Sequence, residues 1–192
     1  MPSKISGCYK TSTVAGESVQ AFVPNPLPPE DFQLSPEIQY LNEQANRALG
    51  RLDMATLQLP DLGQFLYVYI RKEALLSSQI EGTQSSFADL LLFENNELPG
   101  VPLDDVVEVS NYVAAINHGL KRIREDDFPV CVRLIKELHS ILLRKGRGEH
   151  KTPGEFRQSQ NWIGGTRPGN AGFVPPPKEL IEECMSDLEK FI

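Results

Sequence analysis

The chain has 192 residues, of which 40% are hydrophobic, enough for one sizeable core near the upper size of a single domain. Its formal net charge of -7 argues against broad electrostatic binding to nucleic acid or to an anionic membrane, because either surface would repel the average face of the protein. No segment approaches the roughly 18 apolar residues that cross a bilayer. Cys8, Cys131 and Cys184 match neither a disulfide framework nor a metal motif, so a cytoplasmic protein with reduced thiols is expected.

The first 34 residues are expected to form an extended arm, because "VPNPLPPEDFQLSP" contains too many prolines for a helix or a central strand. A helix then begins at Ser35, Pro36 and Glu37, since serine is a good N-cap and proline suits the first helical position. Apolar residues follow at helical spacing and predict one buried stripe on this helix: Ile38, Leu41, Ala45, Leu49 and Leu52.

A second helix is predicted after Pro60 and Asp61. Its sequence includes "FLYVYIRKEALL", which is apolar around much of its girth, so this helix is expected to be deeply packed. Gly82 is the predicted left-handed residue that ends the helix, which places Glu81 in the last turn. Exposed backbone carbonyls at a helix C-terminus disfavour a negative charge by about 0.3–1 kcal/mol, so Glu81 lies at an electrostatically unfavourable position.

Further helices complete a chain that is predicted to be all-α apart from one segment. The first is short and covers "FADLLLFE", and the last restarts after the prolines of "FVPPP". The expected boundaries are a cap at Ser85 or Ser86, a start at Asp104 or Asp105, a helix over 132–142 and a helix over 180–188.

The exceptional segment is "PGEFRQSQNWIGGTRPGNAGFVPPP". Within it, "NWIGG" and "AGFVP" are aromatic and β-branched runs on either side of a Gly/Pro/Asn loop, which predicts a small β-hairpin. Such a hairpin is either a structural flap or a rigid edge to which another peptide adds a strand, and periodicity does not choose between the two.

The three histidines, His118, His139 and His150, are too scattered to form a zinc pair. His139 in "KELHSILL" is interpreted as a helix packing or boundary residue rather than a catalytic base, because a lone histidine is a weak signal.

Ser77 and Glu81 are four positions apart and therefore share one face of the second helix. One interpretation is a solvated polar helix end, since the electrostatic penalty is small. The other is that Glu81 has a cationic partner outside this helix, which would more than offset that penalty. No arginine of this chain is an obvious partner.

The pattern Ser77-x-x-x-Glu81-Gly82 resembles the inhibitory motif of Fic family proteins, Ser/Thr-x-x-x-Glu-Gly/Asn. Three blocks, "RKEALLSSQIEGTQSSFADLL", "GEFRQSQNWIGG" and "FVPPPKELIEECMSDLEKFI", are similar to successive blocks of the class whose inhibitory helix precedes the Fic core. The resemblance covers residues 24–192 and implies a Fic-type helical fold with one short β-hairpin flap. It divides the chain into an arm (1–34), an N-terminal domain with the inhibitory helix (35–100) and the first part of the core (101–192).

The resemblance implies an auto-inhibited protein adenylyltransferase that moves AMP from ATP, with Mg²⁺, to a hydroxyl side chain of a target protein. Glu81 would pair with an arginine needed for productive ATP binding, and Ser77 would help to hold the glutamate or its loop. The flap would present a strand edge to a target segment. The implied docking residues are Gln160, Asn161, Trp162, Ile163, Gly164, Gly165, Phe173 and Val174.

The family's catalytic signature, His-Pro-Phe-x-x-Gly-Asn-Gly-Arg-x-x-Arg, does not occur in the sequence and is expected after the helix that reaches Ile192. The chain by itself should therefore be inactive, with no catalytic residue of its own. Alternatives are a non-catalytic regulatory or target-docking module, and a Fic protein that removes AMP or transfers another phosphate-containing group. The resemblance is also compatible with a homodimer.

Overall fold

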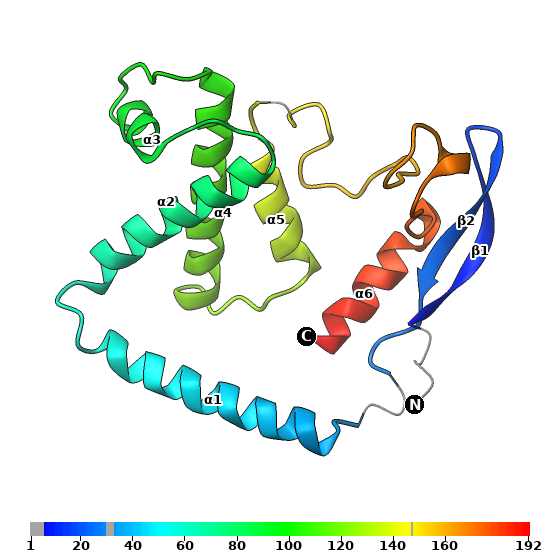
Figure 1. The fold of residues 1–192 in the computed structure, drawn as a ribbon, viewed down its shortest axis with the longest axis horizontal. Helices are drawn as coiled ribbons and strands as arrows, with labels where there is room; N and C mark the ends of the chain where they lie inside the picture. The colour runs from blue at the N-terminus through cyan, green and yellow to red at the C-terminus, as the bar shows by residue number, and fades with distance from the viewer. Residues whose placement is uncertain (1–5, 30–32, 147) are drawn as a thin grey trace.

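The computed structural model describes residues 6–29, 33–146 and 148–192, which form a mainly helical molecule with one small antiparallel hairpin (Figure 1). This confirms the expected helical class. The chain order is β1 (Gly7–Val14), β2 (Glu17–Pro24), α1 (Pro36–Thr56), α2 (Leu62–Ile80), α3 (Phe87–Glu94), α4 (Leu103–Arg124), α5 (Val132–Leu142) and α6 (Ile181–Phe191). Short 3-10 turns lie at Pro168–Asn170 and Lys178–Leu180.

Helix starts follow the predicted capping chemistry. The hydroxyl of Ser35 accepts a hydrogen bond from the Ile38 amide at 3.3 Å, and Pro36 is the first residue of α1. Ser86 and Asp89 form a capping box at the start of α3. The start of α4 differs from the prediction, because this helix begins at Leu103 without a side-chain cap.

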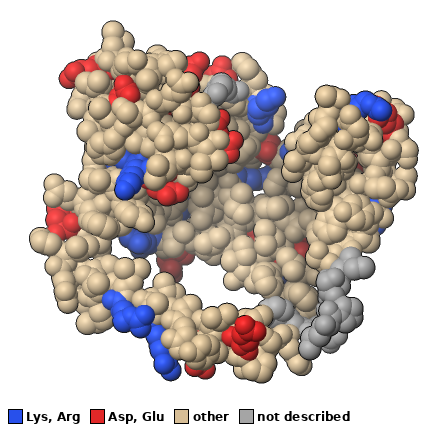
Figure 2. Space-filling view, viewed as in Figure 1, with Lys and Arg blue, Asp and Glu red and all other residues tan. Residues whose placement is uncertain are grey.

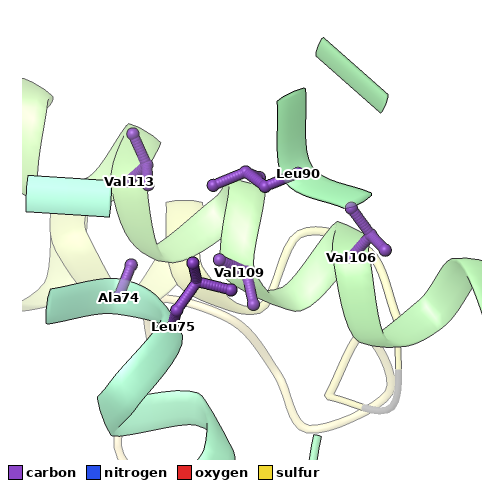
Figure 3. Close-up of a cluster of buried hydrophobic side chains, with 6 residues drawn as sticks. All are labelled: Ala74, Leu75, Leu90, Val106, Val109 and Val113. Carbon is purple, nitrogen blue, oxygen red and sulfur yellow. The ribbon is translucent and has the colours of Figure 1, made fainter. Parts of the chain in front are cut away.

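The main core lies where α2, α3 and α4 meet. Figure 3 shows its six buried side chains pointing toward one another from these helices, and Leu90 of α3 is fully buried among them. Full burial of one leucine stabilises the fold by about 1.5–3 kcal/mol, so this cluster fixes α2 against α4. The cluster comprises Ala74, Leu75, Leu90, Val106, Val109 and Val113.

The predicted buried stripe of α1 is wrong for this structure, because α1 has no buried residue. Leu41, Leu49 and Leu52 are each more than half exposed. Figure 1 shows α1 running apart from the other helices, and Figure 2 shows an opening between it and the rest of the molecule. Spacing identified the apolar face correctly but carries no information on what covers it.

The expectation that α2 is deeply packed holds only for its C-terminal half. Ala74, Leu75 and Ser78 are buried there, whereas Phe65 and Tyr69 near the start are 50% and 60% exposed. The two exposed rings stack on each other, with centroids 5.8 Å apart. The end of α2 that carries the Ser77/Glu81 motif is therefore the firmly held end.

The expected N-terminal arm contains the hairpin of β1 and β2, which sequence analysis missed. Val14 pairs with Glu17 across a two-residue turn, and Ala15 and Gly16 both have positive φ, 51° and 82°. This is the backbone of a type I′ hairpin turn. The runs "CYKTSTV" and "ESVQAFV" on either side of Ala-Gly are typical of a hairpin. The prolines that follow them favour an extended arm, which was the prediction for the whole segment.

The predicted domain boundary lies between residues 100 and 101. The main core contains residues from both sides of it, because α4 packs on α2. The division into domains stays a prediction. Among the described residues, no helix is long and apolar enough to cross a membrane.

Candidate functional site

The end of α2 is a Schellman motif built around the predicted glycine cap. Gly82 has φ of +97°, its amide donates to the carbonyl of Gln79 at 3.1 Å, and the Thr83 amide donates to the carbonyl of Ser78, also at 3.1 Å. The prediction of a left-handed cap at Gly82 is confirmed. Glu81 occupies the C-cap position, with φ of -83° and ψ of 2°.

The loop after Glu81 is tied to the body of the protein at two places. The Gln84 amide donates to a carboxylate oxygen of Asp105 in the first turn of α4, at 2.9 Å. The side-chain amide of Gln79 donates to the carbonyl of Ser85 at 3.1 Å, and Ser85 is fully buried. The backbone that carries Glu81 is therefore held on both sides.

The Glu81 side chain is exposed, and none of the ion pairs found within residues 6–29, 33–146 and 148–192 includes it. Ser77 does not hold it, because the Ser77 hydroxyl donates to a carboxylate oxygen of Glu73 at 2.8 Å. Ser77 and Glu81 share one helical face, but the Ser77 hydroxyl donates its hydrogen bond to Glu73 and not to Glu81. The site is a fixed backbone that presents an unpaired carboxylate.

An ion pair between Arg71 and Glu94 fixes α2 to α3 and was not identified from the sequence. The Arg71 guanidinium donates to both carboxylate oxygens of Glu94, at 2.9–3.1 Å, and also to the Tyr67 carbonyl. The guanidinium lies 3.4 Å from the centre of the Tyr67 ring. Arg71 and Glu94 are twenty-three positions apart, so no local sequence pattern predicts their contact.

The predicted flap hairpin is smaller than expected. Its two runs meet in one isolated bridge, in which the Ile163 amide donates to the Phe173 carbonyl at 2.8 Å and the Phe173 amide donates back at 3.1 Å. Gly164 and Gly165 have φ of +70° and +72°, and the Asn170 side chain accepts hydrogen bonds within the loop. Left-handed glycines end the pairing early, so the flap is a bridged loop rather than a regular hairpin.

The flap residues that were predicted to dock a target differ in exposure. Trp162 is 37% exposed and Ile163 is 66% exposed, and Asn161, Gly164 and Gly165 are exposed as well. Val174 is only 5% exposed, so its side chain is not available to a target. The Gln160 side chain donates to the Pro175 carbonyl at 2.8 Å and therefore holds the base of the flap together.

Arg157 also holds the base of the flap and was not singled out from the sequence. Its guanidinium donates to the carbonyls of Ser159, at 2.8 Å, and Pro176. Burial lowers the pKa of Arg157, with Glu179 acting in the opposite direction. "GEFR" resembled a family block, but only the fold shows that this arginine spans both ends of the flap.

A groove of about 870 Å³ lies beside the flap base, between α5 and the segment before Trp162. Lys136, Lys151 and Arg157 line it, and Lys136 pairs with Glu155 at 3.0 Å. On the face shown in Figure 2, acidic and basic side chains are interspersed. Because Glu155 also lines the groove and neutralises Lys136, the lining has only a small excess of positive charge.

The histidines take structural positions. His139 near the end of α5 accepts a hydrogen bond from the Gly154 amide at its Nδ1, 2.9 Å away, as the packing or boundary interpretation predicts. His118 lies 3.0 Å from a carboxylate oxygen of Glu137, which also accepts from Arg122 at 3.1 Å. The hydrogen bonds from His118 and Arg122 lower the pKa of Glu137. This cluster joins α4 to α5.

Residues 40–121 match the family model described as the Fic/DOC family N-terminal region. The matched range contains α2, the Ser77-x-x-x-Glu81-Gly82 motif, α3 and most of α4. This match supports a Fic family protein with the N-terminal part. No curated protein was found to match the chain.

Proposed function

We propose that this chain is the regulatory and target-docking part of an auto-inhibited protein adenylyltransferase. In the complete enzyme, a core that bears the Fic signature would transfer AMP from ATP to a hydroxyl side chain of a target protein. The match of residues 40–121 to the Fic/DOC N-terminal family model supports the general class, and we propose the activity and its inhibition. The chain contributes the carboxylate that restrains the reaction and the flap that positions the target.

The observation that carries the proposal is the unpaired carboxylate of Glu81 on a fixed helix end. Its charge is unfavourable at a helix C-terminus, and the described part of the chain shows no ion pair that offsets this. An arginine of the catalytic core would offset it, because charge-assisted pairs with arginine are strong. An arginine occupied in this way could not orient the terminal phosphate of ATP for in-line attack.

The exposed apolar faces of α1 and of the first half of α2 support an additional packing partner. We propose the catalytic core as that partner. Within the described residues, no group of three or more His, Cys, Asp and Glu is arranged to hold a metal ion. The proposal gives ATP and Mg²⁺ no ligands in this chain. A cytoplasmic location and a homodimer stay expectations of the resemblance.

Two alternatives differ in what Glu81 does. If the enzyme removes AMP, the glutamate would orient a water rather than restrain a reaction, and its loss would lower activity. If the chain acts as a docking module without a catalytic partner, changes at Glu81 would have no effect on nucleotide transfer.

The test is Glu81→Gly in the full-length protein that carries the signature, with radioactive ATP and with the protein itself as acceptor. We expect at least a tenfold gain in label incorporation, because about 1.4 kcal/mol corresponds to a factor of ten and a hydrogen bond to a charged group contributes about 1.5–3 kcal/mol. Glu97→Gly is the matched control, since Glu97 is also exposed and follows a helix. Equal labelling of Glu81→Gly and the parent protein would refute the inhibitory role.

A further inference from the structure

The N-terminal hairpin and the flap are joined by main-chain hydrogen bonding. The Phe22 amide of β2 donates to the Val174 carbonyl at 2.8 Å, one residue after the Phe173 that pairs with Ile163. Tyr9 of β1 is the residue opposite Phe22 in the hairpin. Four extended segments are thus linked in the order β1, β2, 173–174 and 163, and Figure 1 shows the hairpin beside the flap.

Side chains of both parts share one small core. Val14, Val19 and Ala21 of the hairpin pack with Val174 of the flap, all at 9% exposure or less, and Ala171 lies against them. The Phe22 and Phe173 rings are 6.0 Å apart between centroids. Burial of this cluster favours the hairpin and the flap as a single unit.

An ion pair fixes the tip of the flap to the hairpin turn. Glu17, directly after the Ala15-Gly16 turn, pairs with Arg167. The carboxylate lies against Gly169, where a Cβ atom would be 2.0 Å from a Glu17 oxygen. Base, middle and tip of the flap therefore each have a contact that limits its movement, and two of these come from the hairpin.

Pairing with β2 determines which side of the flap is open. The Ile163 amide and carbonyl both point to the 172–173 strand, and alternation along a strand directs those of Trp162 to the opposite side. Within the described residues, no backbone hydrogen bond to the Trp162 main chain is found. The 173–174 side is occupied by β2, so an added strand fits only beside Trp162 on this flap.

We propose that the N-terminal hairpin is a positioning element for target docking, which holds the flap so that its Trp162 side accepts an extended segment of the target protein. This inference rests on the proposed function, since the docked segment would carry the hydroxyl to be modified. The partner is an extended peptide, bound through its main chain, with an apolar side chain next to the exposed Ile163. Glu17 and Phe22 act through the flap and do not contact the reacting atoms.

The first test is hydrogen exchange on the 192-residue chain. Phe22→Pro removes the amide that donates to Val174 on the flap side of β2, and the β2 amides that face β1 are kept. We expect exchange at the Ile163 and Phe173 amides to accelerate about tenfold, and acrylamide quenching of Trp162, the single tryptophan, to rise. Gln20→Ala is the control, because the Gln20 side chain is exposed and donates its hydrogen bond to Thr11 within the hairpin. Unchanged exchange at both flap amides in a folded Phe22→Pro would overturn the positioning role.

If Phe22→Pro does not fold, variants that exchange the charges of Glu17 and Arg167 test the same positioning role. Glu17→Arg should speed exchange at the flap about twofold to threefold by repelling Arg167, and Glu17→Arg with Arg167→Glu should restore it. No restoration in the double variant would contradict the ion pair's role.

The second test is self-labelling in the full-length Glu81→Gly protein. With Phe22→Pro added, we expect labelling to fall at least threefold while the KM for ATP stays unchanged. Faster exchange without a change in labelling would overturn the docking role. Absence of labelling in Glu81→Gly itself would count against the proposed function instead, and the exchange experiments would still decide whether the hairpin positions the flap.

Discussion

Arg71 of α2 binds both carboxylate oxygens of Glu94 at the end of α3, and the pair is largely buried, with side-chain exposures of 11% and 25%. This contact and the hydrophobic core formed by α2, α3 and α4 together hold α2, whose C-terminal end carries Glu81. The stability of the candidate inhibitory site therefore depends on a contact between Arg71, ten residues before Glu81, and Glu94, thirteen residues after it.

Arg71→Met is expected to lower the free energy of unfolding by about 2–3 kcal/mol, because it leaves the Glu94 carboxylate partly buried without its partner. Urea unfolding followed by circular dichroism measures this change. Lys72→Met is the control, since Lys72 is exposed on the next position of the same helix. If both variants lose a similar free energy of unfolding, the ion pair with Glu94 is not the cause of the loss in Arg71→Met.

Gly82→Ala is expected to destabilise the end of α2 by about 1–2 kcal/mol, because a residue with a Cβ atom is strained at φ of +97°. Apart from the two neighbouring residues, no atom of the described residues lies within 4 Å of the position that this Cβ would take, so the loss comes from the backbone conformation. Gly82→Asn should lose less, since asparagine tolerates the left-handed region. Thermal unfolding compares the two variants, and an asparagine variant less stable than the alanine variant would contradict a conformational cause.

Acid stability should depend on Glu137, whose pKa is lowered by hydrogen bonds from His118 and Arg122. A lowered pKa in the folded state means that the contribution is present above the unfolded pKa of about 4.3 and is lost as the pH falls through the lower folded value. We therefore expect Glu137→Gln to be less stable than the parent protein at pH 6. The difference should shrink as the pH is lowered from 5 to 3.

Thermal unfolding across this pH range measures the dependence on Glu137. Glu43→Gln on α1 is the control and should follow the parent protein at every pH, because Glu43 is 66% exposed and its closest ion pair is 4.0 Å long. A constant difference between Glu137→Gln and the parent from pH 6 to pH 3 would show that the carboxylate's charge is not responsible.

Local chemistry predicted the helices and the geometry at Glu81 well. The caps at Ser35 and Ser86 and the left-handed Gly82 are decided by atoms within a few residues, and the sequence contains all of them. The extent of burial was predicted poorly, as α1 shows, because a periodic apolar face does not specify its partner.

The flap shows the same division between local and long-range information. "NWIGG" and "AGFVP" predicted a turn with short extended sides, and the structure has one bridge between them. The strand next to this bridge is β2, about 150 positions earlier in the chain, and no residue near the bridge indicates that pairing. Long-range pairing of this kind has no local signature in a single sequence.

By itself, the sequence determined the helical class, the Schellman end at Gly82 and the presence of a carboxylate where a helix disfavours one, because backbone geometry and capping act over a few residues. Only the tertiary structure decided that Ser77 turns to Glu73, that Val174 is covered and that, among the residues described, Glu81 has no ion pair and the Trp162 main chain no backbone partner. Those outcomes depend on which distant surfaces meet, and burial and hydrogen bonding between distant segments are set by the packed fold as a whole.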